Sequence, residues 1–257
     1  MNNNMISIIL PTYNERENIL PLITEIIQHL SSKIFEIIVV DDDSPDGTWL
    51  IVEEKAKDDN RIHLHRRIDK KGLTSALNDG INAANGDIIV WMDSDFQMPP
   101  SVVPTMLHQI SNGYDAAVGS RFLKGGADLR YNEDMEQGKI VDVHRFLSKT
   151  ICMLTSKIFV TEHTDWTSGF IAMRKDIFDR FDLFGDYGEY FMYLIHYLIK
   201  SGYKVVEVPY VLMPRQHGAS KTSESYSGMA FKGIKYLYAI FRLKLSDTVH
   251  YSIYRKK

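Results

Sequence analysis

Two carboxylates separated by one residue, Asp93 and Asp95, follow residues 87–92, a mostly apolar run of strand length. A strand that gives way to a loop at this point would let both carboxylates reach a hard divalent cation, and the side-chain carbonyl of Gln97 would add a neutral oxygen ligand. Such a cation could hold a diphosphate. An isolated Asp-x-Asp is also an ordinary polar turn, closed here by Pro99 and Pro100, so its interpretation depends on the rest of the chain.

Two more polar clusters follow predicted strands. They are Pro11-Thr12-Tyr13-Asn14-Glu15 and Asp41-Asp42-Asp43-Ser44-Pro45-Asp46-Gly47-Thr48. Helix capping would explain either one, but four acids within six residues exceed that need. Their mutual repulsion is costly unless hydrogen-bond donors approach them, and a nucleotide base and ribose present such donors. The sequence has neither G-x-G-x-x-G nor a Walker loop, so it supports neither a dinucleotide site nor a P-loop.

Alternating strands and helices position these clusters. Strands are predicted at 6–10, 36–40, 61–65, 87–92 and 115–118, and helices at 16–30, 48–57, 73–84 and 101–111. This alternation predicts an α/β fold with a mainly parallel, doubly wound sheet. The three clusters follow the first, second and fourth strands, so they meet where ligands collect in such folds, beyond the carboxyl ends of the strands.

Composition sets the class. With 257 residues, 44% of them hydrophobic and 25% charged, the chain can bury a substantial core, and its net charge of -3 gives no case for nucleic-acid binding. A single cysteine, Cys152, cannot form an internal disulfide, which fits a reducing compartment. Residues 1–4 lack the cationic lead of a secretory signal, and no apolar run approaches the ~20 residues of a membrane-spanning helix.

Six ordered motifs resemble the polyprenyl-phosphate (dolichol-phosphate) mannosyltransferases, which are family 2 glycosyltransferases with the GT-A fold. They are residues 11–15, residues 39–48, residues 92–97 with Pro99-Pro100, Val118-Gly119-Ser120-Arg121, Asp165 with Ser168-Gly169-Phe170, and Arg215 with Gly218-Ala219-Ser220-Lys221. The resemblance covers roughly residues 5–221. It implies inverting transfer of mannose from GDP-mannose to a polyprenyl (dolichyl) phosphate, giving a β-linked product.

The resemblance also implies roles for single residues. The guanosine pocket would be lined by Pro11, Tyr13, Glu15, Val40 and Asp42; Asp93, Ser94 and Asp95 would face the ribose, diphosphate and metal, with Gln97 completing the metal shell. Arg121, Arg215 and Lys221 would surround the phosphates, and Arg145 and Ser148 could face the acceptor phosphate. Family members often have arginine in place of His217, glutamate in place of Ala219 and, in some, glycine in place of Thr74.

The expected chemistry is consistent with these roles. A Mg²⁺ or Mn²⁺ ion and fixed arginines would neutralise the charge that builds on the leaving diphosphate, and arginine grips phosphate oxygens in bidentate fashion. A lipid phosphate is already anionic near neutral pH, so it can attack the anomeric carbon without strong general-base help. The resemblance makes Asp165 a candidate orienting group or base, because related inverting enzymes with hydroxyl acceptors keep a base at this position; stabilisation of the turn before Ser168 is an equal alternative.

Three later segments complete the prediction. Residues 124–139 have no regular period and read as a loop that closes over the site or as a solvated excursion. Residues 140–159 form a helix with an apolar stripe, and residues 205–211, interrupted by Pro209, form an edge strand that delivers Arg215.

The last stretch differs in charge. Residues 221–257 contain eight Lys or Arg and two acids, a net of +6, with Met229, Ile234, Leu237, Tyr238, Phe241 and Leu245 at helical spacing. We therefore expect a catalytic domain at 1–220 and a basic amphipathic tail at 221–257, which lies on a membrane, packs on the catalytic domain, or does both. The enzyme would be cytoplasmic and peripheral at the membrane face, and would meet its lipid by surface docking or through a separate membrane subunit.

Two rival functions remain open. One is a transferase of the same fold that uses UDP-glucose, another nucleotide sugar or a non-lipid acceptor. The other is a catalytically silent nucleotide-sugar-binding subunit, which would not need the metal and phosphate ligands Asp93, Asp95, Gln97, Arg121 and Arg215.

Overall fold

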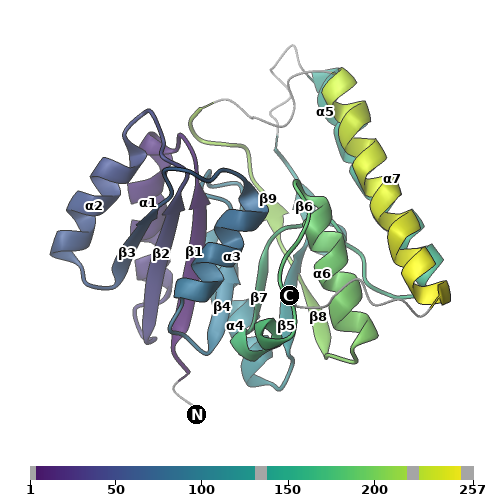
Figure 1. Ribbon diagram of the computed structural model, residues 1–257, viewed down its shortest axis with the longest axis horizontal. Helices are drawn as coiled ribbons and strands as arrows, with labels where there is room; N and C mark the ends of the chain where they lie inside the picture. The colour runs from purple at the N-terminus through teal and green to yellow at the C-terminus, as the bar shows by residue number, and fades with distance from the viewer. Residues whose placement is uncertain (1–3, 131–137, 219–225, 250–257) are drawn as a thin grey trace.

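A seven-stranded sheet with the order β3-β2-β1-β4-β7-β5-β8 forms the centre of the molecule (Figure 1). The computed structural model describes residues 4–130, 138–218 and 226–249. The sheet strands are β1 (Ile6–Thr12), β2 (Phe35–Asp41), β3 (Ile62–Arg66), β4 (Ile88–Trp91), β5 (Ala116–Ser120), β7 (Ile171–Arg174) and β8 (Val205–Pro209); β6 (Ala127–Asp128) and β9 (Val211–Leu212) form a separate pair. Strands β1, β2, β3 and β4 are mutually parallel, as predicted.

Helices cover both faces of the sheet, which is why its inner strands are apolar on both sides. They are α1 (Arg16–His29), α2 (Thr48–Asp58), α3 (Leu73–Ala83), α4 (Val103–Ser111), α5 (Gly138–Phe159), α6 (Glu189–Lys200) and α7 (Tyr226–Val249), with short 3-10 turns at Pro100–Val102 and Lys175–Asp179. On β1, Ile8 packs into the core under α1, α2 and α4, whereas Ile9 packs into the core under α3 and α6. The predicted α/β fold with a mainly parallel sheet is confirmed.

Strand β7 was not predicted, and it changes what lies beside the site. It runs antiparallel between β4 and β5. Its first residue, Ile171, is therefore at the edge of the sheet where β4 and β5 end. The loop that precedes β7 brings Asp165 and Ser168 to the same edge as Asp93 and Arg121.

Two long helices, α5 and α7, pack side by side at one end of the sheet, with α6 between them and the strands (Figure 1). Helix α7 buries Ala239, Ile240 and Leu243 against the domain. Five apolar positions of the stripe predicted from the sequence are exposed: Ile234, Leu237, Tyr238, Phe241 and Leu245. Both faces of α7 are therefore apolar, which differs from the amphipathic helix that we expected.

The other segment predictions have mixed outcomes. Within the predicted loop, residues 127–128 form β6 and α5 begins at Gly138, so part of it is regular; residues 131–137 lie outside the described residues. The proposed domain boundary at 220 also lies outside them and stays a prediction. Strand β8 lies at the edge of the sheet, as predicted. Within the described part of the chain, no helix combines the length and apolar character needed to cross a bilayer.

Candidate active site

A cavity of about 510 Å³ opens beyond the carboxyl ends of β4 and β5. Its polar wall contains Asp93, Gln97, Arg121, Arg130, Ser148 and Thr167. Its apolar wall comes mainly from α5 and α7, through Leu147, Ile151, Ile234 and Leu237. The cavity thus has a charged floor at the sheet that continues into an apolar flank between two helices.

Asp93 is an acidic side chain at the floor of the cavity. Among the described residues, its carboxylate makes no hydrogen bond or ion pair. Burial raises the pKa of Asp93 to about 7, and the negative charges of Asp95 and Glu15 add to that effect. A cation at this point would relieve both the burial cost and the repulsion.

The loop after Asp93 turns sharply. Phe96 has a φ of 66°, a left-handed conformation that is uncommon for a bulky residue. The turn lets the backbone N–H of Gln97 donate to Asp95 Oδ1 at 3.1 Å. Gln97 Nε2 donates to the Met213 carbonyl at 3.3 Å, which leaves Gln97 Oε1 available to a ligand.

These residues fit a divalent cation that is shared with a substrate. In the described residues, no group of three or more His, Cys, Asp or Glu side chains is arranged to hold a metal. The chain offers two neighbouring carboxylates, from Asp93 and Asp95, and one amide oxygen, from Gln97. Mg²⁺ characteristically binds through one or two carboxylates and completes its shell with phosphate oxygens and water.

Arg215 links two distant acidic residues. Its Nη1 donates to Asp95 Oδ2 at 3.1 Å and its Nη2 to Glu15 Oε1 at 2.5 Å. The segment after β9 carries it there, because the Met213 N–H donates to the Gln97 carbonyl at 2.8 Å. The Asn18 amide holds the other oxygen of Glu15 at 2.8 Å. The guanidinium thus occupies the carboxylate-rich end of the site.

The Asp41–Asp46 cluster is satisfied within the protein, contrary to our expectation that it needs a nucleotide. Asp42 accepts from Arg67 Nε and from the Gly72 N–H, both at 2.7 Å. The other acids have partners too: Asp41 pairs with Ser44, Asp43 with Arg66, and Asp46 with Thr48 and the Arg16 N–H. Arg66 also stacks over Trp49, 3.4 Å from the ring centroid. Donors from inside the motif, Ser44 and Thr48, and from outside it, Arg16, Arg66, Arg67 and Gly72, satisfy the four carboxylates.

The remaining residues of the predicted nucleoside pocket differ in their placement. Tyr13 is half-buried, with the Lys71 ammonium 5.3 Å from its ring centroid. Val40 is fully buried in the core, so only its backbone can face a ligand. Ser94 is 3% exposed, and its Oγ donates to the Pro11 carbonyl at 3.1 Å. Ser94 thereby ties the end of β1 to the end of β4.

Arg121 and Asp165 form a buried ion pair beside the cavity. Arg121 Nε and Nη2 donate to the two oxygens of Asp165 at 2.8 and 2.7 Å. Asp165 is fully buried, and although burial opposes its charge, the Arg121 guanidinium keeps the pKa of Asp165 below its usual value. A carboxylate with both oxygens occupied and no contact with the cavity is placed to orient Arg121.

A hydroxyl chain extends this pair toward α5. Thr167 Oγ1 accepts from Arg121 Nη2 at 2.8 Å and lies 3.1 Å from Ser148 Oγ. Glu207 supports the loop from behind by accepting from the N–H groups of Thr164 and Asp165 at 2.8 and 2.9 Å. Arg121 and Ser148 thus reach one wall of the cavity, while Arg145 is half-buried one turn earlier on α5.

Some predicted site residues lie outside the described residues, and some residues at the site were not predicted. Lys221 and Ala219 lie outside the described residues, and His217 is exposed, with its carbonyl accepting from Arg215 Nε at 2.7 Å. The residues that sequence reasoning missed are Arg67, Asp128, Arg130, Thr167 and Tyr190. Thr167 directly precedes the Ser168-Gly169-Phe170 motif, so it could have been predicted from the sequence. The other four carry no local spacing signal.

Comparison with known proteins agrees with this geometry. Residues 7–181 match glycosyl transferase family 2. A dolichol-phosphate mannosyltransferase from Pyrococcus furiosus is 37% identical over 244 residues, covering 92% of this chain and 64% of that enzyme. A polyprenol monophosphomannose synthase from Mycolicibacterium smegmatis is 33% identical over 225 residues, covering 85% of this chain and 81% of that enzyme. The chain thus spans under two thirds of the length of the Pyrococcus relative.

A solved structure shares the fold at lower identity. Glucosyl-3-phosphoglycerate synthase from Mycobacterium tuberculosis, crystallised with Mn²⁺, uridine diphosphate and phosphoglyceric acid, superposes with a TM-score of 0.65 at 17% identity, covering 94% of this chain and 78% of that one. The family match over residues 7–181 and the two mannosyltransferase relatives lead to one conclusion: this chain belongs to glycosyl transferase family 2, in the group of polyprenyl-phosphate (dolichol-phosphate) mannosyltransferases.

Proposed function

We propose that this protein transfers mannose from GDP-mannose to a polyprenyl phosphate with inversion, giving β-linked polyprenyl-phosphate mannose. The observation that carries the proposal is the two-part cavity, in which the charged floor at Asp93 continues into the apolar flank at Leu237. A sugar diphosphate suits the floor, and the first isoprene units of a lipid phosphate suit the flank. The similarity to the Pyrococcus dolichol-phosphate mannosyltransferase and the Mycolicibacterium polyprenol monophosphomannose synthase supports the same reaction class.

The donor end would hold a Mg²⁺ or Mn²⁺ ion through Asp93, Asp95 and Gln97. The ion would neutralise charge on the departing diphosphate. Arg215 lies against Asp95 and Glu15, within reach of the same space, and can exchange these carboxylates for phosphate oxygens as the donor enters. Tyr13 and the Pro11 backbone border the nucleoside, and Lys221 is assigned to the phosphates by family resemblance alone.

The acceptor end would be formed by Arg121, Arg145 and Ser148. Arg121 Nη1 forms a long ion pair with Asp128, at 3.6 Å, and among the described residues it makes no hydrogen bond, so an incoming phosphate can accept from it. Asp165 orients this guanidinium and does not act as a base, because its low pKa leaves it a weak proton acceptor. The acceptor phosphate is already anionic and needs no base.

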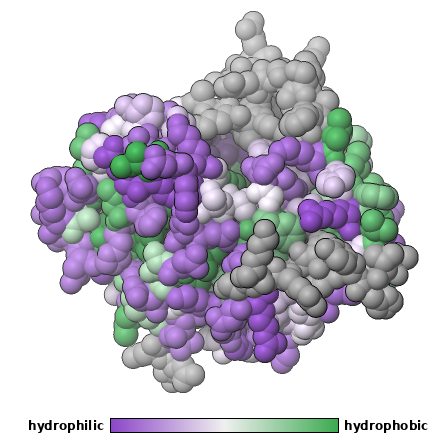
Figure 2. Space-filling view, viewed as in Figure 1, coloured by the Kyte–Doolittle hydropathy of each residue, from purple (hydrophilic) through white to green (hydrophobic). Residues whose placement is uncertain are grey.

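The face formed by α5 and α7 would lie on the membrane surface. Phe146, Met153, Leu154, Tyr238 and Phe241 are exposed on these two helices, and apolar side chains run along the right-hand edge of Figure 2, where α7 lies. Exposed Lys149, Lys157 and Lys244 add positive charge that attracts anionic lipid. A contiguous apolar face of this kind marks an interaction site. Docking there would bring the apolar flank of the cavity to the bilayer.

The direct test is transfer of labelled mannose from GDP-mannose to a polyprenyl phosphate, with and without Mn²⁺. We expect product that depends on all three components. Calorimetry with GDP-mannose and UDP-glucose separates this donor from its main rival, and a non-lipid acceptor tests the other alternative. Binding of GDP-mannose without turnover under any of these conditions would identify a silent subunit.

A further inference from the structure

Tyr190, on α6, presents its hydroxyl group to the cavity. None of the roles predicted above uses this hydroxyl. Tyr190 is 3% exposed, and what it exposes lines the cavity together with Asp93, Met98 and Gly169. It belongs to the first turn of α6, which packs tightly under the sheet, so the ring has little freedom to move. The position of the hydroxyl is thus set by the fold.

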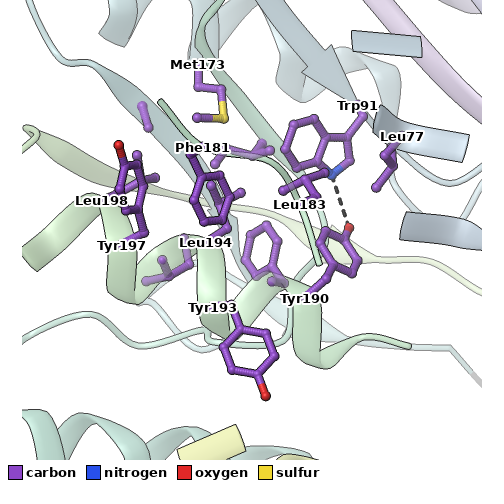
Figure 3. Close-up of a cluster of buried hydrophobic side chains, with 14 of the residues drawn as sticks. Leu77, Trp91, Met173, Phe181, Leu183, Tyr190, Tyr193, Leu194, Tyr197 and Leu198 are labelled. Atoms are coloured by element: carbon purple, nitrogen blue, oxygen red, sulfur yellow. Dashed lines mark hydrogen bonds between the residues drawn. The ribbon is translucent and has the colours of Figure 1, made fainter. Parts of the chain in front are cut away.

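The hydrogen bond to this hydroxyl fixes where its proton points. Trp91 Nε1 donates to Tyr190 Oη at 3.2 Å, as the dashed line in Figure 3 shows. An indole N–H can only donate, so the phenolic oxygen is the acceptor and its own proton must go elsewhere. Among the described residues, no other side chain forms a hydrogen bond with Tyr190 Oη. The proton is therefore available to a ligand in the cavity.

The space in front of the hydroxyl is kept open by a glycine. A Cβ placed on Gly169 would lie 3.6 Å from Tyr190 Oη and 3.6 Å from the Met98 methyl group. The φ of Gly169, +75°, also disfavours any side chain there. The loop that carries Asp165 thus leaves a small polar recess beside Asp93.

Tyr190 and Asp93 make a donor and an acceptor that face one recess. The Asp93 charge acts on Tyr190 strongly enough to help burial raise the pKa of the phenol, so the hydroxyl keeps its proton. An alcohol can accept a hydrogen bond from a phenol and donate one to a carboxylate at the same time. A sugar hydroxyl meets this requirement, whereas an ionised phosphate oxygen can only accept hydrogen bonds.

We infer that Tyr190 donates a hydrogen bond to a hydroxyl of the transferred sugar and so contributes to recognition of the hexose. This inference rests on the proposed function, because it assumes that the cavity holds a sugar nucleotide. It predicts that Tyr190 acts on the sugar part of the donor and not on the nucleotide part.

The test is calorimetry on Tyr190→Phe with two ligand pairs, GDP-mannose with GDP and UDP-glucose with UDP. For the pair that wild type binds, we expect the sugar nucleotide to bind roughly two- to tenfold more weakly and the free nucleotide to keep its affinity within about twofold. Tyr197→Phe is the matched control, since it makes the same change on α6 outside the cavity and should alter neither affinity.

Each other outcome overturns one specific idea. Equal weakening of sugar nucleotide and free nucleotide, or no change in either, sinks the inference about Tyr190. If wild type prefers UDP-glucose, the proposed donor is wrong. The role of Tyr190 can then still be tested with UDP-glucose and UDP. A second variant, Trp91→Phe, removes the orienting N–H while keeping the phenol, and a sugar-specific loss there, smaller than that of Tyr190→Phe, supports the inference.

Discussion

Arg215 Nη1 lies 3.1 Å from Asp95 Oδ2, although 120 residues separate the two along the chain. The contact joins the segment after β9 to the loop after β4. It also places a guanidinium where a diphosphate and its cation would enter. Donor binding and this ion pair therefore compete for the same groups.

The first prediction concerns Arg215. Arg215→Ala should lower the rate of mannose transfer by about 10²- to 10³-fold, the usual cost of removing one group that stabilises developing charge. Arg215→Lys should recover only part of this loss, because an ammonium cannot grip two phosphate oxygens at once. Steady-state transfer assays check both. Full activity in Arg215→Lys would contradict the bidentate role.

The second prediction concerns the cation. Asp95→Ala should abolish turnover without unfolding the protein, and chelation of wild type should do the same until Mn²⁺ or Mg²⁺ is restored. Asp93→Asn should weaken Mn²⁺ binding in the presence of GDP, yet raise Tm in chelator, because it removes repulsion with Asp95 and Glu15. Electron paramagnetic resonance and thermal melting measure the two effects. A lower Tm in chelator would show that the Asp93 charge stabilises the empty site.

The third prediction concerns the buried pair Asp165–Arg121. Asp165→Asn should destabilise the protein by about 3–5 kcal/mol, because it leaves the Arg121 charge buried without its main partner. Urea unfolding measures this. Asp59→Asn is the control, since it breaks the more exposed Asp59–Arg61 pair, and should cost no more than about 1 kcal/mol.

The same pair gives a pH dependence. The pKa of Asp165 is lower in the folded protein than its ordinary value of 3.8. Its contribution to stability is thus complete above that value and is lost as pH falls through the folded pKa. The Asp165→Asn variant should not lose this stability in acid. The difference in unfolding free energy between wild type and variant should therefore become smaller below about pH 4. If the difference in unfolding free energy stayed constant from pH 6 to pH 2, the lowered pKa of Asp165 would be refuted.

The sequence predicted the sheet well because its signals are local. The strands before β5 are short apolar runs, except for β3, where apolar and polar residues alternate. The helices between them have a 3.6-residue period, so the elements within residues 6–120 were placed within a few residues of their observed bounds. Strand β7 was missed because Ile171–Arg174 is only four residues long, and nothing local tells an antiparallel insertion from a turn.

The site was predictable to the extent that its residues lie in motifs. Asp93, Gln97 and Arg121, which lie in the ordered motifs, line one cavity with Ser148, which the resemblance named separately. Arg67 could not be foreseen, because its pairing with Asp42 spans 25 residues and depends on how β3 ends. Tyr190 could not be foreseen either, since its role depends on the distant Trp91.

The fourth prediction concerns membrane docking. Phe241→Ser combined with Leu245→Ser should reduce recovery with anionic liposomes in flotation, because both side chains are exposed on α7. The control is Ile34→Ser with Leu50→Ser, which removes similarly exposed side chains (56% and 48%) away from the α5/α7 face. Equal recovery of both double variants, or unchanged recovery on removal of residues 228–257, would rule out this docking face.

The last prediction tests the orientation of α7. Leu243 is fully buried against the domain, whereas Leu245, two residues later, is 49% exposed. Leu243→Ala should therefore cost about 2–5 kcal/mol in unfolding free energy, whereas Leu245→Ala should stay within about 0.5 kcal/mol of wild type. Both variants remove the same atoms from the same helix, so the difference between them reports which face packs on the domain. If the stripe predicted from sequence were the packed face, the two costs would be reversed, and the apolar surface proposed for the membrane would not exist.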